Sequence, residues 1–125
     1  MTVVRNADAR VTETPGGVMT TLASPTLGGA SRSLWRVEVK PGGQGPLHDF
    51  DVEQVWTWIT GSATVSLGEE TFTVAAGDTV IMPARTARQI VADAAEGYTA
   101  VVTAPGDAHA FGADGKEFGT PAWIV

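Results

Sequence analysis

The chain contains no cysteine. This absence excludes disulfide bonds, thiolate nucleophiles and metal or iron–sulfur sites held by cysteine, and it is typical of proteins that fold in a reducing compartment. No apolar run approaches the roughly 20 residues that a membrane-spanning helix needs. The first residues show no apolar segment of the kind found in secretory signals. We therefore expect a cytoplasmic protein with no membrane partner.

Positive charge is also scarce. Eight Lys and Arg residues stand against 14 Asp and Glu residues, which gives a net charge of −6, and the basic residues form no cluster. Because binding to a nucleic-acid backbone depends on such clusters, we expect no nucleic-acid partner. What the chain does have is turn-forming residues, with 15 glycines and 7 prolines among 125 residues. This composition is typical of short strands joined by turns, in a single domain over residues 1–125.

The hydrophobic pattern predicts strands rather than helices. In SLWRVEVK, residues 33–40, apolar and charged residues alternate, as expected for a strand with one buried face. No segment of ten residues free of glycine and proline shows a helical period. The predicted strands are residues 18–23, 33–40, 52–60, 63–67, 71–74, 79–83, 88–92 and 98–104, with an edge strand in 119–125. We predict an all-β fold that closes as a small barrel or jelly roll.

One histidine stands just before an aromatic strand, in PGGQGPLHDFDVEQVWTWITG, residues 41–61. An unperturbed imidazole titrates near about 6.5, so His48 could act as an acid or a base close to neutral pH. The acids Asp49, Asp51 and Glu53 fall mostly on the other face of this segment. As a group they are expected to raise the pKa of His48 by stabilising its charged form.

Two glycine-anchored segments resemble the motifs of the cupin superfamily. The first cupin motif, G-x5-H-x-H-x3-E-x6-G, is matched in spacing by Gly42, His48, Gln54 and Gly61. The second, G-x5-P-x-G-x2-H, is matched at its start by Gly77, Asp78 and Pro83. The resemblance implies a cupin-type double-stranded β-helix over most of the chain. It also implies a homodimer formed through sheet faces, and residues 52–60 are apolar on both faces, which favours such an interface.

The metal ligands of the cupin motifs are mostly replaced. Metal-binding cupins take His, His and Glu from the first motif and His from the second. At these positions this chain has His48, Phe50, Gln54 and Arg88. Phe50 has no donor atom and Arg88 is a permanent cation, so we expect no metal and no other cofactor. Arg85 replaces the glycine of the second motif, and we expect that turn to be altered.

Arg88 at its motif position should point into the barrel, where a buried arginine needs an anion. That anion is either an internal acid, such as Asp51 or Glu53, or a carboxylate or enolate of a ligand. Phe50 and Trp56 then make the former metal pocket an aromatic, substrate-binding one. We expect Trp58 to pack in the core, and we expect His109, which stands in a loop-like segment, to lie at the surface.

We interpret the chain as a small-molecule-binding cupin and, if it is an enzyme, as a metal-independent isomerase, cyclase or lyase. His48 would be the catalytic acid or base, Arg88 would hold negative charge on an oxygen, and Gln54 would orient the substrate. The ligand would be anionic or would carry a carbonyl group. Two alternatives stay open. One is a non-catalytic ligand-binding or structural cupin, and the other is a metal-dependent dioxygenase or hydrolase with His109 or Asp51 as a further ligand.

Overall fold

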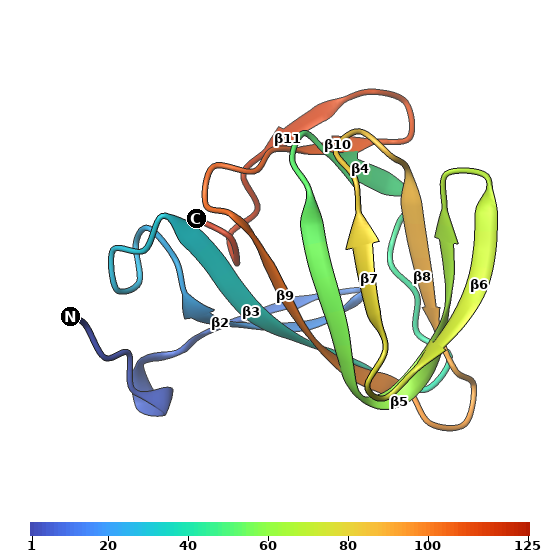
Figure 1. The fold of residues 1–125 in the computed structure, drawn as a ribbon, viewed down its shortest axis with the longest axis horizontal. Helices are drawn as coiled ribbons and strands as arrows, with labels where there is room; N and C mark the ends of the chain where they lie inside the picture. The colour runs from blue at the N-terminus through green and yellow to red at the C-terminus, as the bar shows by residue number, and fades with distance from the viewer.

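The structure, a computed structural model that describes residues 1–125, is an antiparallel sheet of 11 strands curled into a barrel (Figure 1). The strand order is β1-β2-β3-β9-β5-β8-β4-β10-β11, and β6 and β7 also pair with β5. The strands are β1 (Arg10–Thr14), β2 (Gly17–Ala23), β3 (Arg32–Val39), β4 (His48–Phe50), β5 (Gln54–Leu67), β6 (Glu70–Ala75), β7 (Thr79–Met82), β8 (Arg88–Ala92), β9 (Tyr98–Pro105), β10 (Ala110–Gly112) and β11 (Glu117–Gly119). The all-β fold is confirmed. The helical content is one three-residue 3-10 turn, η1 (Asn6–Asp8), and no helix could cross a membrane.

Strand β5 belongs to both walls of the barrel. Its first half pairs with β7 and β9 in one wall, and its second half pairs with β6 and β8 in the other wall. The sequence predicted two strands here, residues 52–60 and 63–67, and this was wrong. The chain instead continues through a bulge between Trp58 and Thr60 and through Gly61, whose φ is 74°. The bulge and the glycine bend the strand sharply at the lower edge of Figure 1, so that one strand can serve two walls.

Large indole rings on β3 and β5 flank small residues on β9. Trp35 and Trp56 both lie opposite Val102, and Trp58 lies opposite Ala100. The small side chains of β9 leave room for the rings of its two neighbours, and the Trp56 and Trp58 rings stack with centroids 5.5 Å apart. Trp58 is completely buried, so its assignment to the core is confirmed. Each such ring buries about 150–250 Å² and contributes strongly to the hydrophobic stabilisation of the barrel.

The two ends of the chain differ from the prediction. Strands β1, β10 and β11 were not predicted, and no strand forms beyond Gly119. The expected edge strand in 119–125 was therefore wrong. The last residues form a turn that buries Ile124 in the core, and the carbonyl of Trp123 accepts a hydrogen bond of 2.7 Å from the Thr21 hydroxyl. The Thr21 hydroxyl on β2 therefore holds this segment by a side-chain hydrogen bond, in place of the backbone hydrogen bonds that a paired edge strand would make.

Arg85 adopts a backbone conformation that is typical of glycine. Its φ is 55°, a left-handed conformation that is uncommon for a residue with a side chain. Its backbone N–H donates to the carbonyl of Phe50 at 2.7 Å, and its side chain lies 2.8 Å from the Asp49 carboxylate. These contacts hold Arg85 in a conformation that glycine adopts readily, and an alteration of the turn relative to other cupins stays a prediction.

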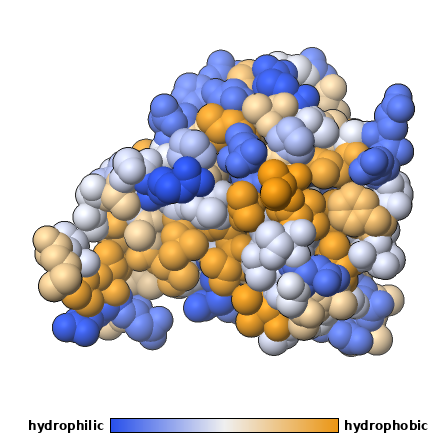
Figure 2. All heavy atoms as spheres, in the orientation of Figure 1, coloured by the Kyte–Doolittle hydropathy of each residue, from blue (hydrophilic) through white to orange (hydrophobic).

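The outer face of β5 and β7 is partly apolar. Ile59 on β5 is 51% exposed and Ile81 on β7 is 60% exposed, and Figure 2 shows hydrophobic surface over this part of the barrel. Val55 lies opposite Ile81 in the strand register and is half-buried. The face has the character of the sheet interface that the cupin resemblance implies. The homodimer stays a prediction.

Candidate functional site

A cavity of about 970 Å³ lies between the two walls of the barrel. Its lining includes His48, Phe50, Gln54 and Trp56, so four of the five predicted site residues share one space. Its volume is at the upper end of the roughly 300–1,000 Å³ typical of small-molecule sites. The sequence did not single out four further aromatic lining residues, which are Trp35, Tyr98, Phe118 and Trp123.

His48 has one ring nitrogen committed to the protein. Its Nδ1 lies 2.7 Å from the carbonyl oxygen of Pro46. A carbonyl can only accept, so Nδ1 carries a proton and donates it. In the neutral ring Nε2 is then an acceptor with no hydrogen bond to the protein. The Phe50 ring stands edge-on to the imidazole with centroids 5.3 Å apart, which restricts the ring's orientation.

The pKa of His48 is lowered from its usual value. Burial is the largest influence and lowers the pKa, while the Pro46 hydrogen bond opposes that change. The charge of Arg88 lowers the pKa further and that of Asp49 raises it slightly. Of the three acids that were expected to raise this pKa, Asp49 alone contributes, and desolvation exceeds the effect of this single half-buried carboxylate, so the net change is downward. The imidazole is therefore mainly neutral at pH 7 and available as a base.

This shift makes the stability of the fold depend on pH. The folded pKa lies below the value of 6.5 for the unfolded chain, so the unfolded state takes up the proton first. The stability contributed by the neutral imidazole is complete above pH 6.5 and is lost as the pH falls through the folded value. We expect His48→Gln to lose less stability than wild type between pH 7.5 and pH 5 in urea unfolding. Equal losses in the two proteins would contradict this.

Two donors fix the side-chain amide of Gln54. Its Oε1 accepts hydrogen bonds from Trp56 Nε1 at 3.1 Å and from Arg88 Nη1 at 3.4 Å. Both neighbours can only donate, so the amide oxygen must face them and the NH₂ group must point away. Nε2 is buried and has no hydrogen-bond partner, although Gln54 lines the cavity. A buried donor without a partner costs about 1–3 kcal/mol, so Nε2 is the group in the cavity that most needs an acceptor.

Arg88 lies behind the cavity wall rather than in it. It is only 1% exposed and is not among the lining residues. Its Nε donates to the Thr86 carbonyl at 3.0 Å and its Nη2 to the Pro83 carbonyl at 3.1 Å, in addition to the bond with Gln54. Burial lowers the pKa of Arg88 to about 10. Neutral oxygens, rather than an internal acid, satisfy the guanidinium.

The predicted acids lie away from the cavity. Asp49 pairs with Arg85, and Asp51 accepts a hydrogen bond of 2.8 Å from the backbone N–H of His109. Glu53 is exposed at the surface. His109 lies partly exposed at the surface, as predicted, and pairs with Glu117 on β11. None of these residues lines the cavity, and neither Asp51 nor Glu53 is a partner of the buried arginine.

The donor set at the cupin metal position does not fit a divalent metal ion. His48 offers one free nitrogen, Phe50 offers none, and the Gln54 oxygen already accepts two hydrogen bonds. Arg88 would bring a positive charge close to the ion. No group of three or more His, Cys, Asp or Glu side chains converges in the structure. We therefore assign no chemical step to a metal.

A protein-family model described as "Cupin domain" matches residues 35–104, which span β3 to β9 and include both motif segments. The chain belongs to the cupin family. No curated protein matches this cupin in sequence. Its fold is similar to that of the polyketide cyclase RemF from Streptomyces resistomycificus, with 25% identity over 84% of this chain and 79% of that one and a TM-score of 0.71.

Two further solved cupins share the fold at lower identity. KdgF from a Halomonas species is 18% identical, with 84% of this chain and 94% of that one covered and a TM-score of 0.69. An RmlC-like cupin from Shewanella frigidimarina is 15% identical, with 82% and 89% covered and a TM-score of 0.69. These likenesses show that the barrel of this cupin has the common architecture of small cupins.

Proposed function

We propose that this cupin binds a small carbonyl-bearing molecule in the barrel cavity and that His48 removes a proton from it without the help of a metal. The observation that carries the proposal is the buried, unpartnered Nε2 of Gln54, a residue that lines the cavity together with His48, whose own Nε2 has no hydrogen bond to the protein. One group is a donor in need of an acceptor, and the other is a neutral base. A carbonyl compound with an acidic C–H bond matches both.

The proposed step is enolisation. His48 Nε2 takes the proton from the carbon beside the carbonyl, and the electron pair of that C–H bond forms a carbon–carbon double bond. The carbonyl oxygen gains negative charge, which the Gln54 NH₂ group stabilises by donating a hydrogen bond. The Pro46 carbonyl, which accepts from Nδ1, stabilises the imidazolium. The enolate can then be protonated elsewhere, attack a second carbonyl or expel a leaving group, which are isomerase, cyclase and lyase reactions.

In this proposal Arg88 acts through Gln54 rather than on the substrate. Its positive charge lies on the far side of the amide, where it polarises the Gln54 oxygen and so strengthens the NH₂ group as a donor. The 25% identity to a polyketide cyclase supports the cyclase form of the reaction, since the named activity of that protein is a ring closure. Catalysis by a base and a hydrogen-bond donor is compatible with the absence of a fitting metal donor set.

The test is α-proton exchange, which reports enolisation whatever the later step. We expect the protein to accelerate exchange of the α-protons of 2-tetralone in D₂O above the buffer rate, measured by NMR. His48→Gln should lower the protein-catalysed rate about 10²–10⁴-fold, and Gln54→Leu about 10²–10³-fold. Both variants should still bind the ketone, as measured by quenching of tryptophan fluorescence.

Two outcomes would favour the other candidate functions. Binding of 2-tetralone without any exchange above the buffer rate would identify a non-catalytic ligand-binding cupin. Loss of exchange on adding EDTA, with recovery on adding back a divalent metal, would identify a metal-dependent enzyme. His109→Gln serves as the matched control, because His109 is the other histidine of the chain and lies outside the cavity.

A further inference from the structure

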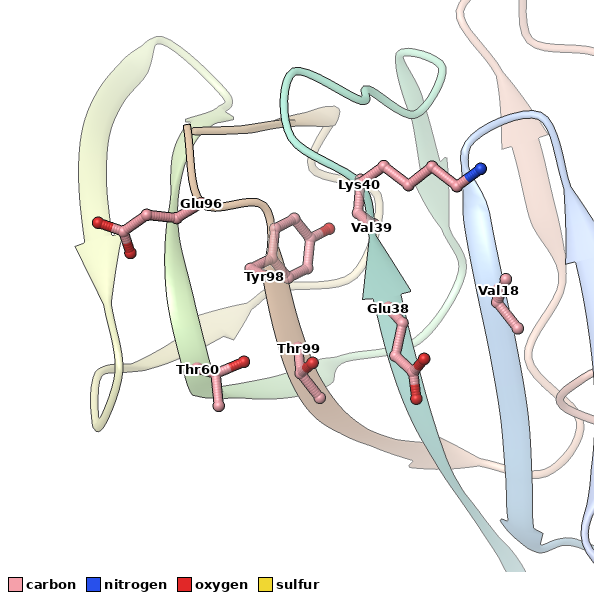
Figure 3. Close-up of a pocket in the computed structure, with 8 residues that line it drawn as sticks. All are labelled: Val18, Glu38, Val39, Lys40, Thr60, Glu96, Tyr98 and Thr99. Carbon is pink, nitrogen blue, oxygen red and sulfur yellow. The ribbon is translucent and has the colours of Figure 1, made fainter. Parts of the chain in front are cut away.

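A second buried polar group lines the cavity far from Gln54. Tyr98, the first residue of β9, is 6% exposed as a residue, and no hydrogen bond joins its hydroxyl to the protein. The hydroxyl is not among the fully buried atoms without a partner, so it opens onto the space beside it. Its ring is held against Trp58 with centroids 5.8 Å apart. Tyr98 also lines a second, smaller pocket, drawn in Figure 3, where its hydroxyl end lies on the side of Val39, a residue that lines both spaces. A tyrosine hydroxyl that is free of protein partners and opens onto a cavity can donate a hydrogen bond to a ligand atom there. Burial raises the pKa of Tyr98, which keeps the hydroxyl protonated.

The two unpartnered donors lie level with opposite ends of β9, Tyr98 at the start of that strand and Gln54 on the neighbouring strand β5. Val55 lies opposite Thr103, which places Gln54 level with Ala104. From Ala104 to Tyr98 is six residues, or roughly 20 Å of strand at about 3.3 Å per residue. Both residues line the same cavity. A ligand that meets both donors must therefore be elongated.

The wall between the two donors is aromatic. Trp35 and Trp56 stand on either side of Val102 along this length, and Trp123 from the end of the chain also lines the cavity. Indole faces pack well against planar rings. Because β3 and β5 fix the positions of these tryptophans opposite Val102, their side chains lose little further freedom when a ligand binds. This wall favours a flat, fused-ring molecule over a flexible or branched one.

The cavity offers no counter-ion to an anionic ligand. No Lys or Arg is among its 25 lining residues, and its single residue with a formal charge at neutral pH is the acidic Asp114. Arg88 is committed to three protein oxygens behind the wall. The net charge of −6 adds a further unfavourable field. An uncharged ligand avoids all of these penalties.

We propose that Tyr98 forms a second hydrogen-bonding subsite, and that the cavity selects an elongated, uncharged, fused-ring aromatic molecule with an oxygen acceptor at each end. This inference rests on the proposed function, because it assumes that the Gln54 end of the cavity receives an oxygen atom. It adds the length, planarity and charge of the ligand, and it assigns Tyr98 a role in binding rather than in proton transfer.

Three anthraquinones of equal ring size test this at pH 6. The probes are 2,6-dihydroxyanthraquinone, with an oxygen at each end, anthraquinone, with none, and anthraquinone-2,6-disulfonate, with a charge at each end. We expect the dihydroxy compound to bind best in titrations followed by tryptophan fluorescence. Tyr98→Phe should weaken its binding about tenfold, as for loss of one hydrogen bond, and should leave anthraquinone binding unchanged.

The matched control is Thr99→Val, which removes the hydroxyl of the next residue on β9. Thr99 lines the smaller pocket of Figure 3 but not the barrel cavity, so the variant also separates the two spaces that Tyr98 adjoins. This variant should bind all three probes as wild type does. Equal binding of the dihydroxy compound by wild type and Tyr98→Phe would overturn the subsite. Equal affinity for the disulfonate would overturn the charge selection, and failure of every probe to bind would overturn the inference as a whole. The exchange assay with 2-tetralone tests the proposed function separately, whichever of these results is obtained.

Discussion

Alanine at position 61 is expected to destabilise the fold by about 4 kcal/mol or more, at the extreme end of single substitutions. A Cβ atom on Gly61 would lie 2.0 Å from the carbonyl oxygen of Gly97 and 2.8 Å from the Cα of Tyr98. Both are backbone atoms of the strand partner, so neither can move aside without separating β5 from β9. The positive φ of 74° adds about 1–2 kcal/mol for any residue with a side chain.

Gly42→Ala is the matched control for this prediction. Gly42 has nearly the same φ, 73°, but no atom lies within 4 Å of a Cβ built on it. We expect this variant to lose only the conformational part, about 1–2 kcal/mol. Urea unfolding of the two variants beside wild type measures the difference. Similar losses at both positions would show that the close approach of Gly97 is not what requires glycine at position 61.

Removal of the buried indole at position 58 should have an effect of similar size. Trp58 is fully buried between the rings of Trp56 and Tyr98, with centroids 5.5 and 5.8 Å away. Trp58→Ala removes the whole ring and leaves a void beneath the cavity wall, so we expect a loss of about 3–5 kcal/mol. Thermal or urea unfolding gives the value. The two neighbouring rings would also lose their backing, which should broaden their NMR signals.

Trp58→Phe should be tolerated far better than the change in volume suggests. The Nε1–H of Trp58 is buried and has no acceptor, a penalty of about 1–3 kcal/mol that the native fold carries. Phenylalanine gives up part of the ring volume but also removes this donor, so the two effects largely offset each other. We expect a net loss of about 1 kcal/mol. A loss equal to that of the alanine variant would mean that the indole N–H has an unrecognised partner.

The sequence located the central part of the site because its signals were local. The spacing of Gly42, His48, Gln54 and Gly61 resembles a cupin motif, and that resemblance implied the cupin barrel and the inward orientation of His48. Alternation placed Gln54 on one face of its strand, together with two tryptophans. What it could not supply were the partners of Arg88. These partners include the carbonyl groups of Pro83 and Thr86, in a turn whose shape depends on the left-handed conformation of Arg85. Residue propensities do not predict a left-handed conformation for an arginine.

The remaining lining residues could not be predicted for a different reason. Alternation assigns Trp35 and Tyr98 to the inner face, just as it assigns Trp58. Which inner positions pack and which face open space depends on the residues opposite them across the barrel. Trp35 lies opposite the small Val102 on the side of the cavity, whereas Trp58 lies between other rings. That distinction requires the three-dimensional register.

The shared strand β5 has a consequence for how the molecule opens. Because its two halves pair with different walls, neither wall can come apart while the other keeps its full hydrogen-bond ladder. The protein therefore has no boundary along which a subdomain could unfold alone, and its core amides should exchange with solvent through a single cooperative event. Ligands must then enter through movements of the loops and short strands at the rim, since the barrel itself cannot part.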